Sequence, residues 1–289
     1  MQSSSYARTD LACEAPSSGI TEYEKDGIRV STLTVTPETA EETGRVPGTY
    51  ITADAGTLSL LDSEDTEHLS ALLAAELRNM AERLTGHPVT KETKVLVCGL
   101  GNRFITPDAL GPQTADKVTV TRHVVGTGGV FDALGCSSVA AIQPGVLGQT
   151  GIEASDVIRG AAAEIKPDLV VAVDALAARS CARLSKTFQL SDAGIAPGSG
   201  IGNRRTAISR EELGIPVIAL GVPTVVDSST LVYDALEEAG VSEISDALRD
   251  VLEGGKKFFV SPKDSDILIR ELSSILASAI DRAFGTDLS

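Results

Sequence analysis

Four short runs of continuous apolar residues constrain the fold of this chain more than any other feature. They do not alternate with polar residues, and helix-like stretches lie between or after them. Unalternating strands interleaved with helices are typical of a parallel sheet that helices cover on both faces. We therefore predict an α/β fold with a mainly parallel sheet. The runs are Val95–Cys98, Val139–Ile142, Leu169–Val173 and Val217–Leu220.

The N-terminal part has a different pattern, which predicts a β-rich elaboration of this sheet. Residues 28–35 alternate apolar and polar side chains, as a strand with one wet face does, and residues 49–52 are β-like. The first 20 or so residues are small and polar, which predicts an extended arm. Helical spacing is found at 63–84 and, approximately, at 108–118, 152–165, 210–213, 228–239 and 265–284.

Composition narrows the functional class. The chain has 289 residues, 25 Lys and Arg against 40 Asp and Glu, a net charge of −15, and 3% aromatic residues. Such an acidic surface repels phosphate backbones and anionic lipids, so we expect no direct nucleic-acid binding and no membrane association. A protein partner that is itself basic, or that comes to this chain from a complex with DNA, remains compatible with this negative charge. No run is long enough to span a bilayer and no signal-peptide core is present, so we expect a cytoplasmic protein.

Ligand sites in an open parallel sheet lie at the carboxyl ends of the strands, and two carboxylates follow the apolar runs. Asp108 stands after the glycine-rich turn behind the first run, and Asp174 directly follows the third. Asp108 at a helix start has a structural interpretation, as a carboxylate that offsets the helix dipole. Asp174 has one as well, as a buried carboxylate satisfied by loop amides. The alternative interpretation is a catalytic pair.

Other chemistries fit the sequence poorly. Phe104 occupies the place of the third glycine of a dinucleotide motif, and the segment 198–205 lacks the ending of a P-loop. The backbone amides of that segment are suited to an oxyanion or a carbonyl, unless it is merely a mobile turn. No G-x-S-x-G elbow is present, and the His and Cys residues have no metal-ligand spacing, so we predict no metal and no cofactor. Paired-carboxylate chemistry remains.

The chain carries six longer motifs, in this order: Arg8–Ala12, Gly99–Asn102, Thr106–Pro112, Ala141–Val146, Asp174–Ala177 and Pro197–Arg205. Together they resemble the germination proteases of spore-forming bacteria, and the resemblance covers nearly the whole chain. It implies an endopeptidase, related in fold to the hydrogenase-maturation proteases, that begins the degradation of small acid-soluble spore proteins during germination. It also implies a homotetramer in the forespore and spore core.

The resemblance also implies site residues. The proposed catalytic carboxylates of the family correspond to Asp108 and Asp174, which makes the chain an aspartic-type endopeptidase. It implies a zymogen that cuts itself between Asp10 and Leu11, with residues 1–10 as propeptide and 11–289 as a single α/β protease domain. The amides of 198–203 are candidates for substrate binding, namely those of Gly198, Ser199, Gly200, Gly202 and Asn203.

A mechanism follows from the physics of close carboxylates. Two carboxyls that share one proton divide into a base and an acid. Asp108 at a helix start is favoured as the anion that activates water, and Asp174 as the acid that protonates the carbonyl or the leaving amine. Two further hypotheses stay open: a non-catalytic peptide-binding scaffold, and a nickel-dependent protease of the hydrogenase-maturation type, although no nickel-binding histidine can be placed in this sequence.

Overall fold

The computed structural model describes residues 9–15, 19–56, 58–60, 62–127, 129–196, 206–241, 244–254 and 258–286. The strands in this part of the chain join one nine-stranded sheet in the order β1-β2-β3-β7-β8-β6-β4-β5, with β9 paired to β8. They are β1 (Thr21–Lys25), β2 (Ile28–Val35), β3 (Gly48–Asp54), β4 (Lys94–Gly99), β5 (Ser138–Ile142), β6 (Leu169–Ala178), β7 (Thr187–Ser191), β8 (Val217–Asp227) and β9 (Phe259–Val260).

The sheet is mixed. Strands β8, β6, β4 and β5 are parallel, as the four apolar runs predict. The N-terminal strands β1, β2 and β3 continue the same sheet in antiparallel pairing, which is the predicted β-rich elaboration. The short strand β7 was not predicted; it lies antiparallel between β3 and β8 and joins the two halves. The prediction of a mainly parallel sheet therefore holds for one half only.

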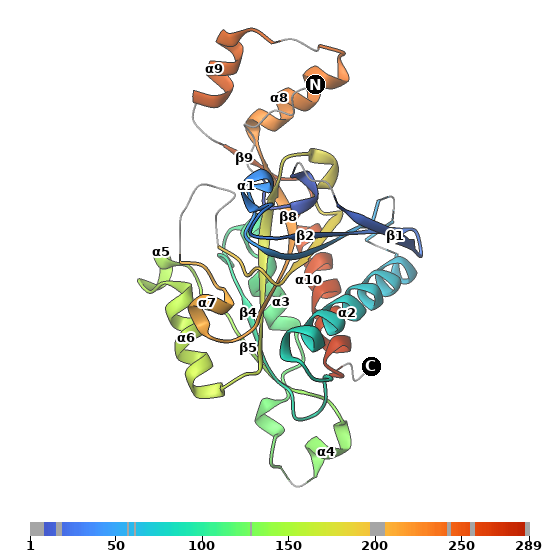
Figure 1. The fold of residues 1–289 in the computed structure, drawn as a ribbon, viewed down its shortest axis with the longest axis vertical. Helices are drawn as coiled ribbons and strands as arrows, with labels where there is room; N and C mark the ends of the chain where they lie inside the picture. The colour runs from blue at the N-terminus through green and yellow to red at the C-terminus, as the bar shows by residue number, and fades with distance from the viewer. Residues whose placement is uncertain are drawn as a thin grey trace.

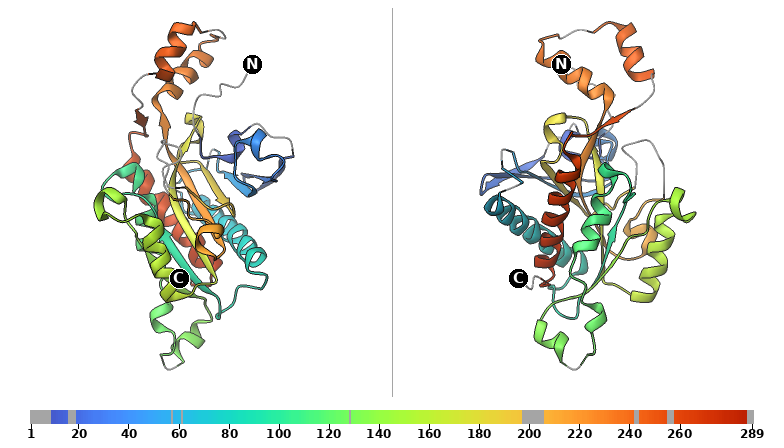
Figure 2. Two further views of the ribbon diagram at one scale, coloured as in Figure 1. Left: turned by 60° about the vertical axis from the view of Figure 1, so that its left-hand side comes forward. Right: turned by 180° about the vertical axis from the view of Figure 1, so that it is seen from behind.

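Helices cover both faces of the parallel half (Figures 1 and 2). Helices α2, α3 and α10 lie on one face, and α6 and α7 on the other. The helices are α1 (Ala40–Thr43), α2 (Ser63–Thr85), α3 (Leu110–Lys117), α4 (Val130–Leu134), α5 (Leu147–Thr150), α6 (Ala154–Ile165), α7 (Arg210–Leu213), α8 (Ser228–Glu238), α9 (Asp246–Gly254) and α10 (Ser265–Ala283), with short 3-10 turns η1 (Ala12–Glu14), η2 (Thr106–Asp108), η3 (Arg122–Val124) and η4 (Cys181–Arg183).

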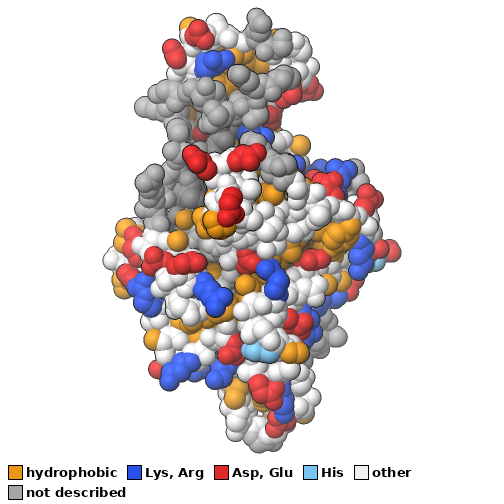
Figure 3. Space-filling model, viewed as in Figure 1, with side chains coloured by type: hydrophobic (Ala, Val, Ile, Leu, Met, Phe, Trp, Pro, Cys, Tyr) orange, Lys and Arg blue, Asp and Glu red, His pale blue; other side chains and the backbone are white. Residues whose placement is uncertain are grey.

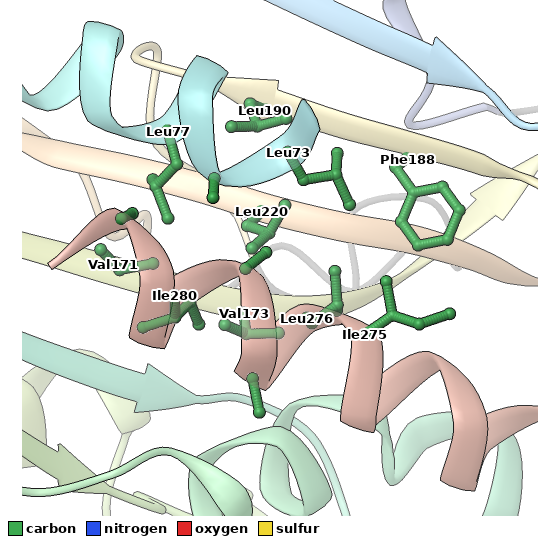
Figure 4. Packing of buried hydrophobic residues seen from close by; sticks show 14 of the residues in the cluster. Leu73, Leu77, Val171, Val173, Phe188, Leu190, Leu220, Ile275, Leu276 and Ile280 are labelled. Atoms are coloured by element: carbon green, nitrogen blue, oxygen red, sulfur yellow. The ribbon is translucent and has the colours of Figure 1, made fainter. Parts of the chain in front are cut away.

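The larger core lies between the sheet and the pair α2 and α10. Figure 4 shows Leu73 and Leu77 of α2 and Leu276 and Ile280 of α10 facing side chains of the sheet, and all four are buried. Alternation along β6 sends Val171 and Val173 into this core and Val170 and Ala172 toward α6. Asp174 therefore belongs by register to the face that carries α6.

The surface agrees with the acidic composition. Acidic and basic side chains are interspersed over the body of the molecule (Figure 3). Helices α8 and α9 project beyond the end of the sheet (Figure 1). Among the described residues, no helix combines the length and the apolar composition that a membrane span requires.

Candidate active site

Asp174 lies inside a strand rather than at its end. β6 continues to Ala178, and Asp174 is paired with Gly221 of β8. On the other side, β4 ends at Gly99 opposite Val173, and the amide of Leu100 donates to the carbonyl of Val173 over 2.8 Å. Asp174 thus lies just beyond the carboxyl end of β4, whereas β8 continues alongside it. Its side chain is 5% exposed, and its Oδ1 accepts the amide of Ala175 at 2.9 Å.

A cavity of about 370 Å³ opens beside Asp174 on the α6 face of the sheet. Its floor comes from residues in register on neighbouring strands, and small side chains at Ala219, Gly221 and Ser191 leave the space open. A Cβ on Gly221 would stand 2.7 Å from Cγ of Leu176 and 2.9 Å from the carbonyl oxygen of Asp174, so a side chain there would displace both neighbours. The polar lining includes Arg45, Tyr50, Asp174 and Gln189.

Asp108 stands in the turn η2, before α3, where the sequence predicts a helix start. The turn lies against β6 and β8, and Thr224 of β8 donates to the carbonyl of Pro107 at 2.8 Å. Oδ2 of Asp108 accepts the amide of Asn102 at 2.7 Å. Asp108 is half-buried and is not among the described residues that line the cavity of Asp174. The fold therefore brings the turn that carries Asp108 against β6, the strand that carries Asp174. Of these two carboxylates, Asp174 lines the cavity and Asp108 does not.

The N-terminal segment 9–15 is docked on the sheet, so the prediction of an extended arm is wrong for these residues. Thr9 and Asp10 line the same cavity as Asp174. The side chain of Leu11 is fully buried against Leu176, Ala178 and Val226. Apolar contact with strands more than 160 residues away holds the segment in place, and no local pattern predicts such contact.

Polar contacts also hold this segment. The amide of Asp10 donates to the carbonyl of Ala177 at 2.9 Å, and the amide of Ala177 donates to Oδ2 of Asp10 at 2.8 Å. Nη2 of Arg45 donates to the carbonyl of Leu11 at 2.8 Å. Glu14 is buried, and its carboxylate accepts the amides of Arg179 and Ser180 at 2.8 and 3.0 Å. Both sides of the Asp10–Leu11 bond are thus anchored.

Two of the residues that line the cavity, Arg45 and Gln189, lie outside all of the sequence motifs. Arg45 follows a short polar helix, and Gln189 lies on the unpredicted strand β7. The alternation in Thr-Phe-Gln-Leu-Ser at 187–191 is the one local signal for that strand, with Phe188 and Leu190 buried on the opposite face. Burial also raises the pKa of Tyr50, an effect that the nearby guanidinium of Arg45 opposes.

The remaining predicted residues are placed as follows. Gly198, Ser199, Gly200, Gly202 and Asn203 lie outside the described residues, although Ala196, shortly before them, lines the cavity. The described residues contain no group of three or more His, Cys, Asp or Glu side chains that could hold a metal ion.

Burial raises the pKa of the thiols of Cys13 and Cys98, and burial with the neighbouring Asp234 raises that of Cys181 to about 11. None of these three thiols is activated as a nucleophile.

Comparison with known proteins gives consistent matches. A family model described as germination protease matches residues 6–239. A germination protease of Caldanaerobacter subterraneus is 38% identical over 98% of this chain and 95% of its own length. That of Clostridium acetobutylicum is 39% identical over 96% of this chain and 94% of its own. That of Bacillus subtilis is 43% identical, with 80% of this chain and 66% of the relative aligned.

Proposed function

This chain belongs to the germination protease family and is a protease of spore germination, and from that premise we propose its substrate, its processing and its mechanism. It initiates the degradation of small acid-soluble spore proteins in the forespore and spore core, as a homotetramer. It is made as a zymogen that removes its own residues 1–10, so that residues 11–289 are the protease domain. Its fold is related to that of the hydrogenase-maturation proteases.

One observation carries the proposal of self-processing. The Asp10–Leu11 bond begins in the cavity that Asp174 lines, because Thr9 and Asp10 are lining residues as well. Contacts with β6, β7 and Arg45 hold the chain on both sides of this bond. A peptide bond held beside a buried carboxylate is the arrangement that hydrolysis within one chain requires.

The carboxylates take different roles in the proposed mechanism. The hydrogen bond from the amide of Asn102 favours the charged form of Asp108, which suits a base that takes a proton from water. Asp174 is 5% exposed, and this burial favours its neutral form in opposition to the amide of Ala175, which donates to its Oδ1. We assign Asp174 the role of the acid on the basis of this burial. Water adds to the carbonyl carbon, the carbon–nitrogen bond breaks, and the acid protonates the leaving amine. The net charge of −15 favours basic substrates.

Substitution of each carboxylate tests the mechanism. We expect Asp108→Asn and Asp174→Asn each to slow cleavage by ~10²–10⁴-fold, because the amide keeps the shape and removes the proton-transfer group. The assay is mass spectrometry of the N-terminus together with gel analysis of a small acid-soluble spore protein. Asp156→Asn is the control, since Asp156 is an exposed acid of α6 that forms an ion pair with Arg159 over 2.6 Å.

Near wild-type turnover in either variant would remove that aspartate from the mechanism. Tight binding of the spore protein without any cleavage would support the scaffold hypothesis instead. Loss of wild-type cleavage in EDTA, restored by nickel, would support a metal-dependent protease.

A further inference from the structure

Gln189 of β7 bridges the bond that the proposed self-processing cuts. Its Nε2 donates to the carbonyl oxygen of Asp10 at 3.0 Å, and its Oε1 accepts the amide of Ala12 at 2.6 Å. The two hydrogen bonds fall on opposite sides of the Asp10–Leu11 peptide bond. We propose that Gln189 is a catalytic residue, the donor that stabilises the oxyanion formed on the carbonyl of Asp10. The inference rests on the proposed cleavage at this bond.

The orientation of the Gln189 amide follows from its partners. The oxygen and nitrogen of a glutamine amide are told apart by their hydrogen-bond network. A backbone amide can only donate, so the atom that faces Ala12 must be the oxygen. The nitrogen then faces the carbonyl of Asp10, which can only accept. The fold therefore aims an N–H group at the reacting carbonyl before any reaction begins.

The surroundings strengthen this donor. Gln189 is 7% exposed and lines the same cavity as Asp174. The backbone of Gln189 pairs with Thr52 of β3 and Gly221 of β8, so the side chain starts from a central strand rather than from a loop. A preorganised donor that is buried among protein atoms stabilises a developing charge more than the same donor does in bulk water.

The chemistry at this bond is an ordinary hydrolysis. The water oxygen bonds to the carbonyl carbon of Asp10, and the π electrons move onto the carbonyl oxygen, where Nε2–H of Gln189 faces the developing charge. Asp108, the base of the proposed mechanism, takes a proton from the water. The carbon–nitrogen bond then breaks, Asp174 as the acid protonates the nitrogen of Leu11, and Asp10 keeps the new carboxyl group. The donor matters most when the charge is largest, so its loss lowers kcat more than it raises KM.

Two variants separate the donor from the rest of the side chain. Gln189→Met keeps the length and removes both polar atoms, and Gln189→Glu keeps an acceptor for Ala12 but removes the N–H. We expect each to release residues 1–10 more slowly than wild type by ~10²–10³-fold. Processed enzyme carrying either change should lose kcat on a small acid-soluble spore protein at nearly unchanged KM.

Thr187→Val is the matched control on the same face of β7. The hydroxyl of Thr187 is buried and has no hydrogen-bond partner among the described residues, so valine removes nothing that the fold or the reaction uses. Thermal unfolding of each variant shows whether the strand stays intact. Folded Gln189 variants that release residues 1–10 slowly, together with an unaffected Thr187→Val, would support the proposal.

Three results would count against it, and they are distinguishable. Folded Gln189→Met that releases residues 1–10 at the wild-type rate overturns the role of Gln189 and leaves the proposed function standing. A rise in KM at constant kcat makes Gln189 a binding residue only, which also overturns the catalytic role. Wild-type protein that neither loses residues 1–10 nor cuts the spore protein overturns the proposed function itself.

Discussion

At the scale of single residues, Gly99 and Gly111 explain the glycine-rich turn after β4 without any nucleotide. A Cβ on Gly99 would stand 2.2 Å from the carbonyl oxygen of Gly111. A Cβ on Gly111 would stand 2.3 Å from the carbonyl oxygen of Leu100 and 2.4 Å from that of Val173. The start of α3 therefore lies directly against the end of β4 and against the middle of β6. This close approach positions the turn that contains Asp108.

Gly111→Ala tests this packing. We expect it to lower the free energy of unfolding by more than about 2 kcal/mol, because backbone atoms on two strands must move to admit the methyl group. Gly160→Ala is the control: Gly160 is an exposed residue of α6, a Cβ there meets nothing within 4 Å, and alanine should stabilise the helix by up to about 1 kcal/mol. Urea unfolding measures both, and equal stabilities would contradict the packing argument.

At the scale of elements, α10 connects the C-terminal end of the chain to the main core. It packs against α2 and α3 and covers the face of the sheet opposite the cavity. Nη1 of Arg282 and the carboxylate of Glu67 form an ion pair at 2.6 Å between α10 and α2. An ion pair this close to the surface contributes little to the free energy of unfolding, so the buried apolar side chains supply most of the stability.

Leu276→Ala in α10 should therefore lower the free energy of unfolding by about 2–5 kcal/mol, because Leu276 is fully buried (Figure 4). Ile267→Ala is the comparison, in the same helix and two and a half turns before Leu276. The side chain of Ile267 is 42% exposed, so its truncation should lower the free energy of unfolding by less than about 1 kcal/mol. Chemical denaturation followed by circular dichroism compares them. Similar losses in both variants would mean that α10 is not anchored through its buried face.

At the scale of the whole molecule, the projecting part formed by α8, α9 and the described residues beside them carries exposed apolar side chains. Leu231 and Val241 are 42% and 43% exposed, Val251 is 68% exposed, and Phe258 is 62% exposed. Exposed apolar side chains on a part that stands away from the core are accessible for contact with another chain. This part is the natural candidate for contacts within the proposed tetramer.

Val251→Asp and Phe258→Ser should shift the assembly toward smaller species in sedimentation velocity, since each removes apolar area that association buries. Val130→Asp is the control, because Val130 is 54% exposed in α4, at the opposite end of the molecule (Figure 1). Circular dichroism should remain unchanged in all three. If the assembly is unaffected by both changes in the projecting part, its contacts lie elsewhere.

The sequence by itself determined the parallel half of the sheet, most of the helices and the family. Continuous apolar runs, helical spacing and long motifs are local signals, and they are readable because they report which side chains must leave water. Asp108 and Asp174 were found in the same way, since both follow apolar runs. Their roles in catalysis remain a proposal.

Only the tertiary structure decided which segments meet. It placed β7 between β3 and β8, brought Gln189 to the carbonyl of Asp10, and buried Leu11 against β6 and β8. It also corrected the prediction of an extended arm for residues 9–15. The partner of β7 in β3 and the partners of Leu11 in β6 and β8 are more than a hundred residues away along the chain. A local pattern records that a residue is buried but not what buries it.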